Sequence, residues 1–254
     1  TALGVAAGYT LQSGQQNTFV GHHAGFGFTT GGFSVAVGSL ALDAATTSSY
    51  NTAVGYAALS TANTGANNTA VGSSALALVS TGGSNIGVGI NAGDTISTGH
   101  SNVAVGAYSL EHVTTASGNT AIGTSALYHN TGAGNVAVGQ NAGHGNTTGE
   151  SNTALGFYAQ DVCNTGYSNT GVGREANGAV TTGYQNTAIG SLCMLYNTTG
   201  NNNTAIGVRA LEDMNGGSQN TAVGEFAGAN VTSGSRNIFV GANNSPAITT
   251  GSDN

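Results

Sequence analysis

A short segment recurs along the whole chain. The sequence N-T-A-I-G begins at Asn186, begins again at Asn203, and returns in closely similar form in both directions. Rows aligned on this segment start seventeen residues apart, except for one step of sixteen from Asn119 to Asn135. Units this short cannot bury a hydrophobic face alone, so they stack on one another. We therefore predict a single repeat array over residues 1–254, and we number the positions in each row as places one to seventeen.

Places two to four predict a short β-strand. Place four is aliphatic in every row, place two is Thr, Val or Ile, and place three is small in all rows except those of Phe19 and Phe239. This alternation has the period of two that is typical of strands, and β-branched residues favour strands. A second short strand is expected near places eight and nine, where Ala is usually followed by Leu or Gly.

The remaining places indicate turns and a close approach of the backbone. Place five is Gly in every row, which marks a bend or a close backbone contact. Most rows close with Thr and Gly at places fourteen and fifteen, which are turn residues. In the sixteen-residue row we place the missing residue between Leu127 and Asn130, in the second turn, so that the first strand is unchanged.

The row length limits the fold. Seventeen residues are too few for a strand, a helix and two connections, but they suffice for two strands of about five residues and two turns. The predicted fold is therefore all-β: a parallel β-solenoid of about fifteen coils with two short strands per coil, each coil stacked on the last at roughly 4.8 Å.

Asn at place one predicts a ladder of identical side-chain amides. Like residues lie over like residues when coils stack, so each amide is expected to bond the next, as amide ladders do in cross-β structures. The predicted ladder comprises Asn51, Asn68, Asn85, Asn102, Asn119, Asn135, Asn152, Asn169, Asn186, Asn203, Asn220 and Asn237.

The composition excludes two classes of partner. Only 5% of residues are charged, and the net charge of −7 with three Lys plus Arg cannot neutralise phosphates, so we predict no nucleic-acid partner. No apolar run approaches the roughly 20 residues that span a bilayer, so we predict no membrane insertion.

Cys163 and Cys193 are predicted to be buried thiols. They lie two rows apart. Two coil steps of roughly 4.8 Å exceed the Cα separation of about 7 Å that a disulfide allows.

The motif N-T-A-V-G-x-x-A-L followed by T-G resembles the shaft repeats of bacteriophage tail-fibre proteins. It also resembles the head domain of YadA-type trimeric autotransporter adhesins, whose repeat has an S-V-A-I-G core. The rows that begin at Asn51 and Asn186 carry the motif almost letter for letter, and the resemblance covers the whole chain. It implies a left-handed parallel β-roll, a side-by-side homotrimer, and an extracellular location as a cell-surface fibre or a virion tail fibre. The adhesin heads use a shorter repeat, so the outer turn is longer here.

Packing gives a separate reason for a trimer. Ala and Gly at places three and eight suit the narrow space between two walls, so place four is expected to point away from that space. The resulting aliphatic column would be an apolar patch of the kind that marks an interface, and three copies around an axis would bury it. The alternative is that place four fills the interior and place three faces outward. The predicted trimer interface comprises Val20, Val37, Val54, Val71, Val88, Val105, Ile122, Val138, Leu155, Val172, Ile189, Ile206, Val223 and Val240.

No catalytic constellation is recognised, so we predict no enzyme activity, no cofactor and no metal. The G-x-G segments at Gly87 and Gly171 arise from Gly at place three and precede no predicted helix. Acidic residues and histidines at places ten and eleven of five successive rows could hold a transition metal, although we favour a solvated turn. These residues are Asp94, Glu111, His112, His129, His144 and Asp161.

The leading hypothesis is a structural extracellular fibre or shaft with an adhesive or receptor-binding role. Its expected partners are copies of itself and a cell-surface glycan or protein receptor. One alternative is a self-assembling filament with end-to-end stacking, because the chain starts and ends in phase with the repeat. Another is an ice-binding solenoid, because Thr at place fourteen forms a nearly regular column.

Overall fold

The computed structural model describes residues 1–245 and 250–253 and divides into two compact units, Thr1–Ser125 and Ala126–Asn254. The fold is an all-β parallel β-solenoid of about 14 turns with about 17 residues per turn, which confirms the predicted fold class. The described residues form no helix, and hence none that could cross a membrane. Handedness, the trimer and the single continuous array stay predictions. Asn254, where a further row would begin, lies outside the described residues.

Each coil contributes one short strand at places two to four. In the first unit the strands are β1 Ala2–Leu3, β2 Thr18–Val20, β3 Val35–Val37, β4 Thr52–Val54, β5 Thr69–Val71, β6 Ile86–Val88, β7 Val103–Val105 and β8 Thr120–Ile122. In the second unit they are β9 Val136–Val138, β10 Thr153–Leu155, β11 Thr170–Val172, β12 Thr187–Ile189, β13 Thr204–Ile206, β14 Thr221–Val223 and β15 Ile238–Val240.

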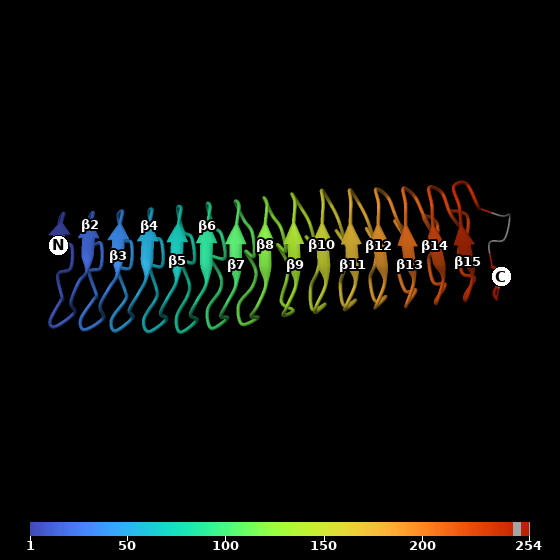
Figure 1. Ribbon diagram of the computed structural model, residues 1–254. Helices are drawn as coiled ribbons and strands as arrows, with labels where there is room; N and C mark the ends of the chain where they lie inside the picture. The colour runs from blue at the N-terminus through green and yellow to red at the C-terminus, as the bar shows by residue number, and fades with distance from the viewer. Residues whose placement is uncertain (246–249, 254) are drawn as a thin grey trace. The chain divides into compact units, whose positions relative to one another are not determined.

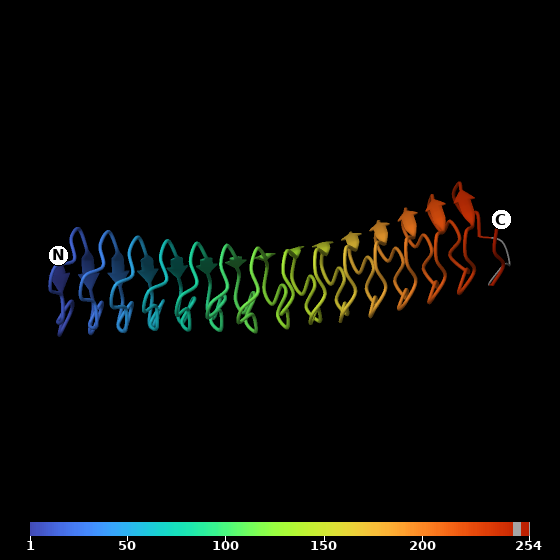
Figure 2. The ribbon, with the colours of Figure 1, turned by 90° about the horizontal axis from the view of Figure 1, so that it is seen from below.

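Within each unit the strands lie side by side in chain order and pair in parallel (Figures 1 and 2). The register advances by one row, so that Ala36 lies opposite Ala53 in the first unit and Ala188 lies opposite Ala205 in the second. Like residues therefore lie over like residues in both units, as the repeat predicts.

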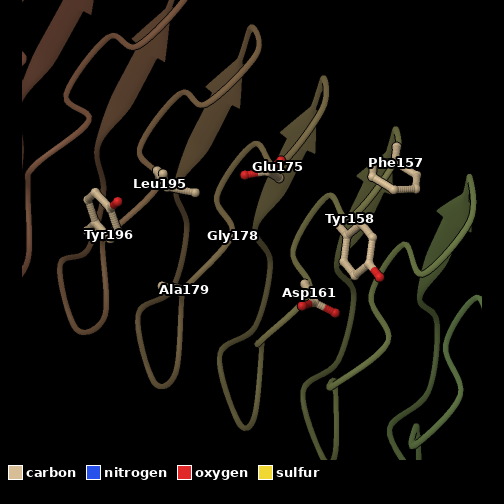
Figure 3. Close-up of a pocket in the computed structure, with 8 residues that line it drawn as sticks. All are labelled: Phe157, Tyr158, Asp161, Glu175, Gly178, Ala179, Leu195 and Tyr196. Atoms are coloured by element: carbon tan, nitrogen blue, oxygen red, sulfur yellow. The ribbon is translucent and has the colours of Figure 1, made fainter.

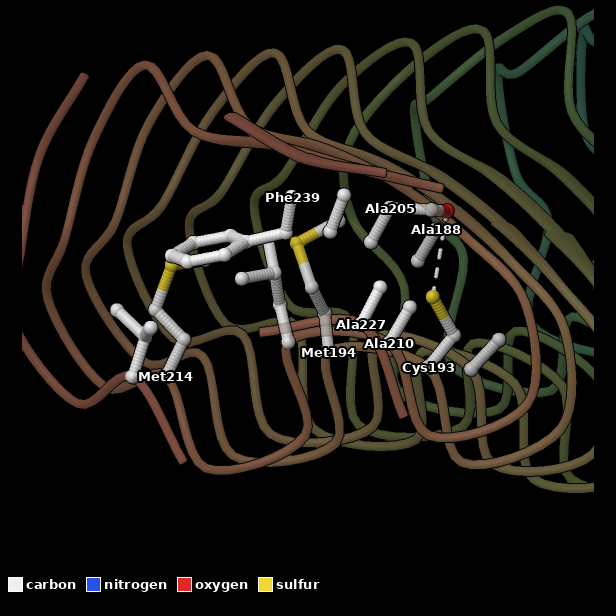
Figure 4. Packing of buried hydrophobic residues seen from close by; sticks show 12 residues of the cluster. Ala188, Cys193, Met194, Ala205, Ala210, Met214, Ala227 and Phe239 are labelled. Atoms are coloured by element: carbon white, nitrogen blue, oxygen red, sulfur yellow. Dashed lines mark hydrogen bonds between the residues drawn. The ribbon is translucent and has the colours of Figure 1, made fainter. Parts of the chain in front are cut away.

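The interior of each coil is narrow and is filled from two walls. Place three of each full strand is buried, whereas places two and four face outward. The opposite wall contributes Ala at place eight and larger side chains at place nine, such as the fully buried Leu42 and Leu59. In the second unit, Phe239 lies beside Met194 and Met214, whose flexible side chains fill the space around its ring (Figure 4).

Residue sizes on the two walls compensate for each other. Phe19 brings a ring to place three, and Gly25 occupies place nine of the same coil; a Cβ atom on Gly25 would lie 2.7 Å from that ring. The converse occurs where Gly87 stands at place three, because a Cβ atom there would lie 2.7 Å from Cγ of Leu76. Since interiors are close-packed, enlargement on one wall requires reduction on the other.

The predicted second strand is wrong. Places six to eleven form turns in which residues of positive φ alternate with residues of negative φ, as at Leu40 and Leu42, whose φ values are 60° and 51°. Because the sign of φ reverses at each step, the segment does not wind into a helix. The N–H groups of Leu40 and Leu42 donate to the carbonyls of His22 and Ala58 in the neighbouring coils, both at 3.0 Å. Gly and Ala are poor strand formers, and these bonds between coils satisfy the backbone instead.

The missing residue of the short row lies later than predicted. The His129 N–H donates to the His144 carbonyl, which places His129 at place eleven and Asn130 at place twelve. The next residue, Thr131, donates to the Thr147 carbonyl as places thirteen and fourteen both do in complete rows. Gly132 then lies against the Gly149 carbonyl, as glycines at place fifteen do, so the absent residue is one of these two places, after Asn130. The Asn130 Nδ2 group closes the shortened turn by donating to the Gly132 carbonyl at 2.8 Å.

Glycine at place five allows neighbouring coils to approach closely. Gly89 has a φ of +135°, and a Cβ atom added there would lie 2.7 Å from the carbonyl carbon and oxygen of Gly106 in the next coil. Real Cβ atoms do not approach a backbone carbonyl this closely. Place five is therefore restricted to glycine by its backbone angle and by the stacking distance together.

We predict that Gly89→Ala lowers the free energy of unfolding by at least about 2 kcal/mol, because strain in φ adds to displacement of the next coil. The matched control is Gly118→Ser at place seventeen, where φ is +72° and no atom lies within 4 Å of an added Cβ. Ser84 and Ser101 already occupy that place with φ of 59° and 57°, so the control should cost less than about 1 kcal/mol. Denaturant-induced unfolding compares the two variants; equal losses would contradict the stacking argument.

Candidate functional site

The most prominent surface feature is the aliphatic column at place four. Nine of the fourteen predicted interface residues are between 36% and 40% exposed; they are Val37, Val54, Val71, Val88, Ile122, Val138, Ile189, Ile206 and Val223. The exposed fractions are nearly constant because, within each unit, each side chain is flanked by similar side chains in the neighbouring coils. Of the others, Val20, Val105, Leu155 and Val172 are half-buried, and Val240 is 66% exposed.

The structure decides which strand face points inward. Ala36, Ala53 and Ala70 at place three are fully buried, so the alternative arrangement, with place three outside, is wrong. Place two shares the outer face with place four and presents Thr, Val or Ile. Each unit therefore carries an uncharged, β-branched face on its strand wall. Coverage of this face by sister chains stays a prediction.

The asparagines at place one lie inside the coils. All twelve predicted ladder residues are at most 4% exposed. The Asn68 backbone N–H donates to Oδ1 of Asn51 at 2.8 Å, and Nδ2 of Asn51 donates to the Gly65 carbonyl at 2.8 Å. The same pattern recurs in the second unit, where Asn186 and Asn203 add the expected contact between two amides, at 3.0 Å. The side chain thus mainly bonds backbone groups, and amide-to-amide bonds occur in only some coils.

The third row shows what happens when place one is not Asn. Ser34 stands there, and its Oγ accepts the Asn51 N–H at 3.2 Å, so it retains the acceptor role between coils. Serine cannot reach place fifteen as Asn does. That place holds Ser48 instead of Gly, and its buried Oγ has no hydrogen-bond partner.

We predict that Asn68→Ala lowers the free energy of unfolding by about 2–4 kcal/mol, since it removes buried partners from two backbone groups. These groups are the Asn85 N–H, 2.9 Å from Oδ1, and the Gly82 carbonyl, 3.0 Å from Nδ2. Asn68→Ser keeps an acceptor, as Ser34 does, and should lose roughly half as much. Chemical unfolding of both variants provides the measurement, and an Ala variant as stable as wild type would refute the buried ladder.

The titratable residues at places ten and eleven do not form a metal site in the described part of the chain, where no group of three or more His, Cys, Asp or Glu is arranged to hold an ion. Asp94, Glu111 and His112 belong to the first unit. In the second unit, Nδ1 of His144 lies 3.9 Å from Oδ1 of Asp161.

The carboxyl group of Asp94 has an unusual environment. Partial burial and then the negative charge of Glu111 raise its pKa from 3.8 to about 6, against the opposing effects of the Thr95 N–H and of His112. One oxygen of each carboxyl group, Oδ1 of Asp94 and Oε2 of Glu111, is buried without a hydrogen-bond partner. The folded protein therefore holds a proton on Asp94 more tightly than the unfolded chain does.

This pKa predicts how stability depends on pH. Because the folded-state pKa of Asp94 is raised, its stabilising contribution is complete below pH 3.8 and is lost as the pH rises through about 6. Asp94→Asn should therefore melt at a higher temperature than wild type at about pH 8 and at the same temperature at about pH 3. Melting curves across this range test the prediction. A constant difference between the two proteins at every pH would contradict it.

The two cysteines are free and buried, as predicted. Burial raises the pKa of each thiol to about 12. Thiolate is the reactive form, so these groups act as small packing residues. The Cys193 thiol also lies 3.2 Å from the Ala205 carbonyl (Figure 4).

Aromatic residues at places sixteen and seventeen stack on the aromatic residue at the same place of the neighbouring coil. The rings of Phe33 and Tyr50 lie 4.9 Å apart with an interplanar angle of 5°, and those of Tyr167 and Tyr184 lie 4.9 Å apart at 2°. These stacked rings add contacts between the turns of neighbouring coils. The sequence reasoning missed a groove on the second unit between Tyr158 and Tyr196, although the small residues Gly178 and Ala179 at places ten and eleven were a visible signal.

Comparison with protein-family models, with curated proteins and with solved structures finds no match to this chain.

Proposed function

We propose that the chain is a structural, non-catalytic component of an extracellular fibre, and that copies of it associate as a trimer through the place-four column. The observation that carries this proposal is the repeated exposure of aliphatic side chains, between 36% and 40% each, on the strand wall of both units. An apolar surface that continues over many coils is the kind that a partner covers.

The chemistry of the column favours a copy of the same chain as that partner. Places two and four, which form the outward strand face, carry only Thr, Val, Ile and Leu, so burying this face removes no charge from water. Burial of apolar surface contributes roughly 25 cal/mol per Å², and the contribution repeats with every coil. When two copies lie in register, the aliphatic column of one chain can pack against the column of the other. A closed ring of three chains shields the strand face of every chain from solvent. The resemblance to phage fibre shafts and trimeric adhesin heads also supports an assembly of three chains.

The remaining surface suits the adhesive part of the proposal. Places six, seven, ten, eleven, sixteen and seventeen vary between rows and include exposed side chains such as Tyr56, Tyr108 and Tyr196. Rigid aromatic side chains provide large contact areas at low entropic cost, whether the receptor is a glycan or a protein.

Sedimentation equilibrium tests the assembly. We predict that the wild-type protein has three times the 24.7 kDa mass of one chain. The variant Val71→Asp/Val88→Lys places charges of opposite sign on neighbouring coils of the column and should be monomeric, because its charges would be buried in the trimer. The control Leu78→Asp/Ile90→Lys alters exposed residues outside the strands and should remain trimeric.

Circular dichroism establishes that both variants fold. A wild-type monomer at tens of micromolar, or a face variant that remains trimeric, would overturn the assembly proposal. Long uniform threads in electron micrographs would favour the filament alternative instead.

A second candidate uses the same face. Thr52 and Val54 alternate on the outer side of β4, and Thr69 and Val71 do so on β5, which gives a regular array of hydroxyl and methyl groups. An ice-binding surface requires such an array to be bare, whereas assembly requires it to be covered. Thermal hysteresis shown by the wild-type protein and lost in the Val71→Asp/Val88→Lys variant would assign the face to ice.

A further inference from the structure

A groove on the second unit combines aromatic rings with carboxylates. It has a volume of about 380 Å³, within the range of small-ligand sites, and it crosses three consecutive coils. Figure 3 shows Tyr158 and Asp161 on one side of Gly178 and Ala179, with Leu195 and Tyr196 on the other. Phe157 and Glu175 complete the lining. These residues lie outside the strands, so the groove is distinct from the place-four column.

The groove results from small side chains in an undistorted backbone. Gly178 and Ala179 occupy places ten and eleven, where the next coil carries Leu195 and Tyr196. The Gly178 carbonyl accepts the Val162 N–H, and the Ala179 N–H donates to the Leu195 carbonyl, both at 3.0 Å, as in the other coils. The hollow is therefore present before any ligand arrives, which reduces the ordering cost of binding.

The aromatic wall is also held in position. The Phe157 and Tyr158 rings meet edge to face, with centroids 4.4 Å apart and an interplanar angle of 82°. Tyr196 on the far side is 52% exposed and presents its ring to solvent. Aromatic faces attract cations as well as apolar groups, and Leu195 and Ala179 add apolar surface between the rings.

The charged lining is entirely acidic. Asp161 and Glu175 are half-buried. Burial raises the pKa of Asp161; His144 opposes this shift, and the negative charge of Glu175 adds a smaller increase. Arg174 contacts Glu175 at 2.5 Å, and His144 lies 3.9 Å from Asp161, but neither residue lines the groove. Among the lining side chains, the carboxylates only accept hydrogen bonds, and the two tyrosine hydroxyls are the only donors.

We propose that this groove binds an alkylammonium group, with the ammonium between the carboxylates and the alkyl chain between the tyrosine rings. Three observations select this chemistry over a sugar: two carboxylates in the lining of one groove, a scarcity of donors for sugar hydroxyls, and apolar surface on its floor. The source of the group is either a lysine side chain of a partner protein or a free polyamine. The proposal does not depend on the trimer or on the fibre function.

Isothermal titration calorimetry with the full chain tests the proposal. The probes are N-acetyl-lysine methylamide, spermidine, the uncharged N-acetyl-norleucine methylamide, and methyl glucoside. We expect saturable binding of at least one amine and at least tenfold weaker binding of the norleucine compound. Tighter binding of the lysine compound identifies a protein partner as the source, and tighter binding of spermidine identifies a polyamine.

Variants locate the site. Gly178→Leu fills the groove with the residue type that place ten of the next coil already carries, at Leu195. The φ of Gly178 is not in the left-handed region, and an added Cβ would lie 3.0 Å from Cδ1 of Leu195 and 3.2 Å from the Glu175 carbonyl oxygen. Because the Leu195 side chain can shift, the variant should fold and abolish binding. Asp161→Asn/Glu175→Gln should weaken amine binding at least tenfold. The control Glu212→Gln changes a place-ten carboxylate outside the groove and should bind as wild type does.

Three results would overturn the proposal: no saturable amine binding, equal binding of the norleucine compound, or full binding by a folded Gly178→Leu variant. Binding of methyl glucoside without amine binding would also overturn it and would assign the groove to a sugar. Sedimentation of the same samples reports the oligomeric state separately, so failure of amine binding is distinguishable from failure of the assembly proposal.

Discussion

The hydrogen bond between a buried asparagine and the next coil fixes the register of the stacked coils within each unit. Oδ1 of Asn51 accepts the backbone N–H of Asn68, and the same side chain holds the place-fifteen turn of its own coil through Nδ2. A slip of one residue would leave both buried groups without partners, at a cost of about 1–3 kcal/mol each. The side chain therefore ties each coil to the next and closes its own coil, which keeps like residues over like residues.

Stacking in register has different consequences on the two walls. On the strand wall it turns one outward aliphatic residue per coil into a continuous apolar column, such as Val54, Val71 and Val88. On the other wall, residues with positive and negative φ alternate, and their backbone groups bond to the neighbouring coils. Side chains at places ten and eleven vary between rows because they belong to no strand face. Small residues there, as at Gly178, open a groove without disturbing the bonds between coils. The strand wall, with its regular apolar column, is thus suited to assembly, and the opposite wall, with variable side chains at places ten and eleven, is suited to ligand recognition.

The period and the strand wall were predictable because both follow from rules of side-chain type. The interval of seventeen corresponds to the length of one coil, and the alternation of Thr, Ala and Val corresponds to the outer and inner faces of a strand. The Gly at place five corresponds to the close approach of neighbouring coils. The second wall was not predictable in the same way, since Leu40 and Leu42 adopt positive φ only because inter-coil bonds and burial offset the strain. The hydrogen-bond partner of each asparagine amide could not be predicted either, because the same sequence repeat is compatible with bonds to another amide and with bonds to the backbone. The groove depends on the small residues Gly178 and Ala179, which are visible in the sequence but indicate a hollow only when the neighbouring coils are placed beside them.

Hydrogen exchange resolved to single amides tests the central claim, that each coil is locked to the next at the asparagine column. The account predicts that the slowest exchange recurs at place one, at Asn51, Asn68, Asn85 and so on, every seventeen residues, with one interval of sixteen between Asn119 and Asn135. These amides donate to buried side-chain oxygens, so they exchange only when neighbouring coils separate. Protection that does not recur with this period, or place-one amides that exchange as fast as the exposed turns, would contradict the account.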